Sequence, residues 1–203
     1  MNEVVQMVGT FLLMAVTVIS IENIVFTRAI GISRIISLVD NITSTVVFCS
    51  LLTVVTIVSG TVYYFLNDFF IKNMIDTAIY RVPAVVLVMS VTYIVIFIIA
   101  IKVMPYEHIG KAAEAMPTAT FNCMVFGTIL LATTEKLSLV ETIIFCLGSA
   151  VGYTLAIILV GEGQRKLQSR DIPAAFKGLP CTLLYLAGIA MAIYGFTGRV
   201  FTN

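Results

Sequence analysis

Charged residues are scarce in this chain. Lysine, arginine, aspartate and glutamate make up 11% of its 203 residues, 60% of the residues are hydrophobic, and the mean hydropathy is +1.06. Soluble domains carry roughly a quarter charged residues. With a net charge of +1 and a single histidine, the chain also lacks the basic stripe that nucleic-acid binding needs. The composition therefore excludes a soluble domain and predicts an integral membrane protein.

Catalytic and metal-binding motifs are missing as well. The chain has no phosphate-binding glycine loop, and its only histidine, His108, falls in a short linker without a nearby nucleophile. The four cysteines show no CxxC spacing, so the sequence indicates no zinc site. Cys49, Cys146 and Cys181 lie in or beside long apolar runs, where a free cysteine usually packs as a small hydrophobic residue. We therefore expect at most a non-catalytic membrane protein.

Six apolar runs of near-spanning length predict an all-α protein with six transmembrane helices. They cover about residues 4–26, 42–66, 82–103, 118–134, 138–161 and 180–198. The first run lacks a basic front region and a small-residue cleavage site, so it is expected to stay as a helix rather than be removed as a signal peptide.

The distribution of basic residues predicts the orientation. One set of linkers carries eight, namely Arg28, Arg34, Lys102, Lys111, Arg165, Lys166, Arg170 and Lys177, and the other set carries four, namely Lys72, Arg81, Lys136 and Arg199. Because cytoplasmic loops are enriched in lysine and arginine, the first set is expected in the cytoplasm. Both termini are then expected outside.

Two runs are interrupted by a polar step. Glu22 and Asn23 interrupt the first run, and Asn122 and Cys123 interrupt the fourth. Short apolar segments broken at matching places in two halves indicate a site inside a membrane protein. Aligning the Val-Phe pairs that follow each step places Glu22 opposite Asn122 and Asn23 opposite Cys123. We expect the folded halves to bring Asn23 and Cys123 together in a sheltered interior.

Three spans per half predict two inverted three-helix repeats, about 1–103 and 104–203, within a single membrane domain. The fourth run is short, since residues 118–132 make only about 22 Å of helix at 1.5 Å per residue. Either this helix tilts in a thin part of the bilayer, or the preceding stretch 106–116 partly re-enters the membrane. Irregular backbone at membrane depth must be covered by protein, so a packed interior and a partner subunit are expected.

The interrupting residues are the candidate functional residues. A carboxylate inside the membrane is a functional candidate by default, so Glu22, with Asn23 and Asn122, is a candidate for an ion pathway. Alternatively, Glu22 lies near the cytoplasmic interface and pairs with Arg28. Cys123 follows Asn122 at an expected helix start, where amide donors would stabilise a thiolate or a cluster sulfur; the alternative is a core cysteine.

Small residues one turn apart predict close helix packing at two places. Gly148 and Gly152 form such a pair in the fifth run, and Gly188 and Ala192 form one in the sixth. Without bulky side chains, the backbones of neighbouring helices are able to approach closely.

Six stretches together carry a family resemblance. They are residues 22–26, 30–32, 121–127, 149–153, 171–178 and 195–198, of which Asp-Ile-Pro-Ala-Ala-Phe-Lys-Gly at 171–178 is the most specific. With the six-span layout, the chain resembles the membrane subunits shared by the Rnf ferredoxin:NAD electron-transport complex and the sodium-translocating NADH:quinone oxidoreductase, above all the A-type subunit of Rnf.

This resemblance implies an inverted-repeat fold in the bacterial cytoplasmic (inner) membrane, with broken first and fourth helices that meet at mid-membrane. It also implies a related partner subunit in the opposite orientation, with each subunit supplying two cysteines to a shared [2Fe-2S] cluster. Electrons would cross the bilayer through that cluster, coupled to the movement of Na⁺ or H⁺. Nicotinamide, flavin and ferredoxin would bind to other subunits.

On this sequence the second cysteine of the family pattern falls on Cys123, whereas the first falls on Ser33. The family continues with proline and phenylalanine after that cysteine, but this chain continues with Arg34 and Ile35. Iron–sulfur clusters are held overwhelmingly by thiolates. Three interpretations stay open: a serine alkoxide completes the cluster, another cysteine replaces it, or the chain is a divergent paralogue without a cluster. The last would make it a small ion or solute transporter, or a homodimeric membrane protein.

Overall fold

The computed structural model describes residues 2–37, 42–69, 77–103, 106–167, 173 and 176–197, and within these ranges it is helical with no strand. The helices are α1 (Asn2–Ser20), α2 (Ile24–Arg28), α3 (Ile32–Ser37), α4 (Ile42–Phe69), α5 (Thr77–Val103), α6 (Tyr106–Thr120), α7 (Cys123–Thr134), α8 (Leu139–Leu167) and α9 (Leu179–Thr197). Half of the 171–178 motif (residues 171, 172, 174 and 175) and the side chain of His108 lie outside the described part.

Four stretches are long and apolar enough to span a bilayer. They are Thr45–Phe69, Ile79–Lys102, Ala115–Thr134 and Leu139–Leu167, and two shorter apolar helices, Gly9–Ser20 and Leu179–Gly195, accompany them. Each of the six predicted runs therefore coincides with a helix. The prediction of an all-α integral membrane protein is confirmed.

The first and fourth predicted spans are broken helices, as expected. The first divides into α1 and α2 around residues 21–23, and the fourth divides into α6 and α7 around residues 121–122. Helix α6 includes the stretch 106–116 and leads directly into the apolar run. The membrane-length apolar stretch Ala115–Thr134 begins within α6 and continues through α7.

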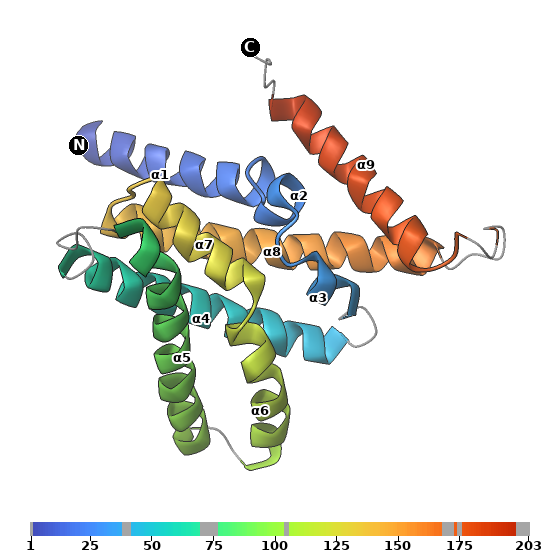
Figure 1. The fold of residues 1–203 in the computed structure, drawn as a ribbon. Coiled ribbons are helices and arrows are strands. Elements are labelled where there is room, and N and C mark those ends of the chain that lie inside the picture. Colours follow the sequence, from blue (N-terminus) through green and yellow to red (C-terminus); the bar gives the residue numbers. More distant parts are fainter. Residues whose placement is uncertain are drawn as a thin grey trace.

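The two halves interlock around α4 and α8, and their contacts repeat when the halves are exchanged. Helix α1 packs on α8 as α6 packs on α4, α2 meets α9 as α7 meets α5, and α2 meets α8 as α7 meets α4. Helices α5 and α9 diverge from the α4–α8 pair on opposite sides (Figure 1). The correspondence is partial: α5 packs closely on α6 and α7 on α8, whereas α9 with α1 and α2 with α4 have at most slight contact.

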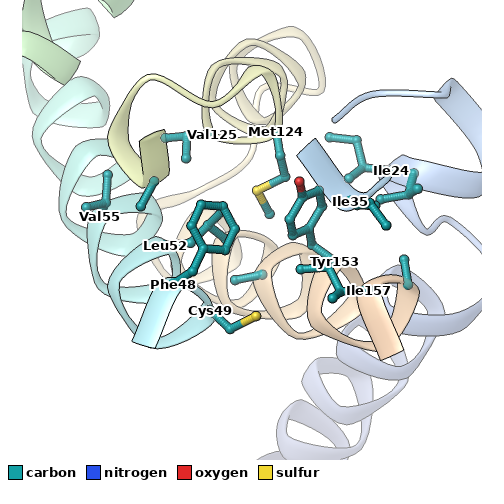
Figure 2. Close-up of a cluster of buried hydrophobic side chains, with 14 of the residues drawn as sticks. Ile24, Ile35, Phe48, Cys49, Leu52, Val55, Met124, Val125, Tyr153 and Ile157 are labelled. Atoms are coloured by element: carbon teal, nitrogen blue, oxygen red, sulfur yellow. The ribbon is translucent and has the colours of Figure 1, made fainter. Parts of the chain in front are cut away.

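The core lies where α4, α7 and α8 meet (Figure 2). Helices α4 and α8 run antiparallel, because Phe48 packs against Tyr153 while Gly60, further along α4, approaches Cys146, which is earlier in α8. Phe48 and Tyr153 are almost fully buried. The outer faces are apolar as well, for example Leu13 and Met191, which suits a surface in contact with lipid.

Candidate functional site

The first break is organised by Asn23. Helix α1 ends where the backbone amides of Ile21 and Glu22 both donate to the carbonyl of Thr17, at 2.9 and 2.8 Å. Asn23 then caps α2, and its side-chain oxygen accepts a hydrogen bond from the amide of Val25 at 3.0 Å. An asparagine cap satisfies an amide that would otherwise be unpaired at the start of a helix. The interruption is therefore a hydrogen-bonded turn with a helix cap rather than a distorted helix.

The side-chain nitrogen of Asn23 ties this turn to α8. It donates to the carbonyl oxygen of Ile19 at 3.0 Å and to that of Gly152 at 2.8 Å, and Asn23 is only 1% exposed. A Cβ added at Gly152 would lie 2.9 Å from this nitrogen and 3.2 Å from the carbonyl oxygen of Ile19. Only glycine therefore permits this approach.

The second break uses the same device. Asn122 caps α7, and its side-chain oxygen accepts from the amide of Met124 at 3.0 Å. Its side-chain nitrogen donates to the hydroxyl of Tyr153 at 3.3 Å, and the residue is 6% exposed. At both breaks an asparagine therefore caps the helix that follows, and the two asparagines bond to adjacent residues of α8, Gly152 and Tyr153.

Tyr153 joins the second break to the segment that precedes Ser33. Its hydroxyl accepts from Asn122 and donates to the carbonyl of Gly31 at 3.1 Å. Gly31 has a φ of +85°, and an added Cβ would lie 2.6 Å from Cε2 of the tyrosine ring, so this position requires glycine. Sequence reasoning assigned no role to Tyr153 or Gly31. A hydroxyl in the middle of a long apolar run was the available signal.

The site lies at the middle of α8. Tyr153 is the central residue of the 29-residue helix α8, with residues 139–152 before it and 154–167 after it. A helix of this length is about 43 Å long, enough to cross the hydrocarbon core and the headgroup layers. Asn23 and Asn122 both bond at this level of α8, so both breaks lie beside the middle of a helix that is long enough to span a bilayer.

The caps correct the predicted alignment of the repeats. Asn23 and Asn122 occupy the same position in their turns, and therefore Ile24, not Asn23, corresponds to Cys123. The valine-aromatic match placed the halves one residue out of register because similar apolar residues follow both turns.

Cys123 and Ser33 are both exposed on the surface of this chain. Cys123 is the first residue of α7, directly after the cap Asn122. Ser33 is the second residue of α3. The expectation that Asn23 and Cys123 are both sheltered holds for Asn23 and is wrong for Cys123. The exposed thiol suits a ligand that is shared with another subunit.

The residues after Ser33 are packed into the fold. Arg34 lies 5.5 Å from the ring centroid of Phe48 and donates to the hydroxyl of Thr118 at 3.3 Å. Ile35 is fully buried. The departure from the proline-phenylalanine pattern therefore fits a short helix that is anchored to α4 and α6.

The resemblance implies a [2Fe-2S] cluster, and few side chains at this site are suitable ligands for it. A cluster shared equally by two subunits needs two thiolates from each, whereas this site offers the thiol of Cys123 and the hydroxyl of Ser33. Cys49 and Cys146 are buried in the helix packing, as predicted, and Cys181 is partly exposed on α9. Among the described residues no three histidine, cysteine or carboxylate side chains gather as a metal site. The residues do not fit a four-thiolate cluster.

Two further predictions concern charge and packing. Glu22 is exposed within the break, and in the described part of the chain it forms no ion pair with Arg28.

Gly148 and Gly152 do allow α1 to approach α8, since an added Cβ at Gly148 would lie 3.1 Å from Val18. By contrast, Gly188 is exposed and meets no other described residue, so its predicted packing is not formed within this chain.

Comparisons with known proteins show what this chain is similar to. A family model described as "Rnf-Nqr subunit, membrane protein" matches residues 11–200. The A-type subunit of the ion-translocating oxidoreductase complex of Shewanella loihica is 26% identical over 190 residues, which cover 94% of this chain and 98% of the relative. The subunits of the same name from Vibrio vulnificus and Aliivibrio fischeri are each 27% identical over 192 residues, which cover 94% of this chain and 98% and 97% of those proteins.

Proposed function

Because this chain belongs to the Rnf-Nqr family of membrane subunits, we propose that it is a membrane subunit of an ion-translocating electron-transport complex. The complex would pass electrons across the cytoplasmic membrane and couple that passage to the movement of Na⁺ or H⁺. The chain itself carries no nucleotide or flavin site in its sequence motifs, so it would provide the membrane path and a surface for partners.

The observation that carries this proposal is the pair of asparagine-capped breaks at mid-membrane. One break is locked against α8 by Asn23, and the other presents Cys123 outward from the start of α7. Helix starts that point into the membrane interior favour negative charge and are typical of sites in membrane carriers. This arrangement supports a role in which charge passes between this chain and a neighbouring subunit.

The partner follows from the exposure of polar groups at this depth. Glu22 is exposed in the first break, and an exposed carboxylate near the bilayer centre is costly against lipid. A second subunit with a matching surface would cover it. We propose a related six-helix subunit in the opposite orientation as this partner, with a second copy of this chain as the alternative.

The substitution of Ser33 favours a second candidate within the same fold. A subunit with one thiol at the site would hold a cluster poorly or not at all, so the chain would act as a cluster-free paralogue that moves ions or a small solute. Cys123 is the residue that would contribute to a shared cluster if one forms. No electron-transfer step is assigned to this chain's own residues.

Affinity purification from native membranes separates these candidates. Recovery of flavin-carrying and ferredoxin-like subunits with the tagged chain is expected, and recovery of the chain alone or as a homodimer would contradict the proposed complex. Iron and acid-labile sulfide in the purified material report on the cluster independently of the partners.

A gain-of-ligand variant tests the site itself. Ser33→Cys restores a second thiol, so the variant is expected to retain more iron than the wild-type chain when it is isolated with its partners. Ser50→Cys, which replaces an exposed serine on α4, is the matched control and should leave the iron content unchanged. Full occupancy of a cluster in the wild-type protein would overturn the argument from Ser33.

The orientation remains part of the proposal. We infer that both termini face the outside, from the excess of basic residues on the linkers at the opposite face. Reporter fusions at each terminus, active only outside or only inside the membrane, test this, and an active cytoplasmic reporter at either end would contradict it.

A further inference from the structure

The carboxylate of Glu22 has no partner in the described part of the chain. Its side chain is exposed in the break between α1 and α2, and it forms no hydrogen bond or ion pair with another described residue. The next residue, Asn23, bonds to Gly152 beside the middle of α8, a helix long enough to span a bilayer. At such a depth a charged side chain is costly unless another group compensates its charge.

The end of α1 adds to the negative charge at this place. Helix α1 ends at Ser20, two residues before Glu22. The last carbonyls of a helix carry partial negative charge, so they favour a nearby cation and disfavour a nearby carboxylate. The carboxylate and the helix end together therefore favour a positive group. Neither Arg28 nor any other cation in the described ranges forms an ion pair with Glu22.

Helix α1 also leaves one face uncovered within this chain. Met14 and Val18 pack inward, whereas Leu12, Leu13 and Val16 are 62%, 71% and 58% exposed and define the outer face of α1. The counterpart of α1 in the second half, α6, packs on both α4 and α5, but α1 packs extensively only on α8. The comparison of the halves therefore leaves the outer face of α1 for a helix of another chain.

A lysine or arginine fits the place beside Glu22 better than a metal ion does. A hard metal ion takes several oxygen ligands. However, the two uncharged polar side chains that follow Glu22 in this turn and in α2, Asn23 and Thr27, already bond to backbone carbonyls. A lysine or arginine from a neighbouring helix carries its own hydrogen-bond donors and needs only the exposed carboxylate as an acceptor.

We propose that the partner subunit places a transmembrane helix along the outer face of α1, and that a lysine or arginine of this helix pairs with Glu22. The inference rests on the proposed function, which supplies a membrane partner, and it adds the surface and the charge by which that partner is recognised. The apolar contact along α1 shields the ion pair from lipid and water. Loss of either charge leaves the other buried and unpaired, which weakens association strongly.

Removing the charge should have opposite effects on the isolated chain and on the complex. The isolated Glu22→Gln chain in lipid nanodiscs should unfold at a higher temperature than the wild type, because an uncompensated carboxylate is removed from lipid. Recovery of the partner subunit with the tagged variant from native membranes should fall at least about tenfold, because the partner's cation is left unpaired. Glu22→Lys should reduce this recovery further, since two like charges then meet.

Glu135→Gln is the matched control. Glu135 is also an exposed glutamate directly beyond the end of a helix, but it follows the apolar stretch Ala115–Thr134 instead of interrupting an apolar run. This variant should keep both the unfolding temperature and the recovery of the partner. Equal recovery of the partner with the wild type and with Glu22→Gln would overturn the pairing and leave the proposed complex intact. Isolation of the wild type without any partner would overturn both.

Measurements on the isolated chain separate the other possible states of Glu22. An unchanged unfolding temperature in Glu22→Gln would indicate a protonated carboxylate, and a lower one would indicate an ion pair within the chain. Stabilisation of the wild type by sodium chloride but not by choline chloride, lost in Glu22→Gln, would indicate a bound metal cation. Each of these results would overturn the proposal.

Discussion

The two breaks in the membrane helices are built alike and exposed differently. Asn23 and Asn122 both cap a new helix through the second amide that follows them. Asn23 makes two further hydrogen bonds to backbone carbonyls, whereas Asn122 makes one, to the hydroxyl of Tyr153. The next residue is the buried Ile24 in the first break and the exposed Cys123 in the second.

The same asparagine cap therefore has different surroundings in the two breaks. In the first break both polar atoms of the Asn23 side chain bond to backbone groups, so this side chain connects α1, α2 and α8. In the second break the Asn122 side chain makes fewer hydrogen bonds, and Cys123, the first residue of α7, is exposed. The first break is therefore closed within this chain, while the second leaves Cys123 available to a partner.

Thiol reactivity offers the largest contrast. In the isolated chain Cys123 is expected to react fully with N-ethylmaleimide, while Cys49 and Cys146 stay unmodified in the folded state because they are 7% and 0% exposed. Mass spectrometry of the digested protein gives the modification at each site. In the assembled complex Cys123 should become protected. Labelling of Cys146 at the rate of Cys123 would show that the described packing is wrong.

Removing each cap tests the difference in locking. Asn23→Ala should lower the free energy of unfolding by about 3 kcal/mol, since it removes a helix cap and two buried hydrogen bonds. Asn122→Ala should cost about 1.5 kcal/mol, since it removes a cap and one longer bond. Unfolding in mixed detergent micelles measures both. Equal losses, or a larger loss at Asn122, would contradict the comparison.

Crowding the first break should have the next largest effect. Gly152→Ala places a methyl group against Asn23 and Ile19 and should cost about 2 kcal/mol through overpacking. Gly161→Ala lies on the same helix, where an added Cβ meets no described atom, and should stabilise the helix by about 0.5 kcal/mol. The opposite signs of the two changes, measured in the same unfolding assay, separate local crowding from helix propensity.

The smallest effect is expected at the link between the second break and Gly31. Tyr153→Phe keeps the ring against Phe48 but removes the hydroxyl that joins Asn122 to the Gly31 carbonyl. A loss of about 1 kcal/mol is expected. In the Asn122→Ala background the same change should cost less, because the two groups share one hydrogen bond. Fully additive losses would show that this bond is not formed.

Local patterns predicted the helices and the places where two of them break. Apolar runs and polar interruptions are properties of neighbouring residues, so the six runs and both breaks could be predicted from the sequence. The alignment of the two halves could not be predicted from these patterns. Matching the Val-Phe pairs shifts the halves by one residue from the alignment that the two asparagine caps give. The exposure of Cys123 was also mispredicted, because a position next to a buried asparagine can face either way on a helix.

By itself the sequence determined that this is an all-α membrane protein and that Asn23 and Asn122 interrupt its helices, while the family resemblance places Ser33 where a cysteine is expected. Only the tertiary structure decided that Asn23 bonds to Gly152, 129 residues away, and that Tyr153 bonds to Gly31, 122 residues away. Hydropathy and capping depend on neighbours along the chain. These contacts depend instead on how closely α1 and α3 approach α8, which is limited by the shapes of side chains far apart in sequence.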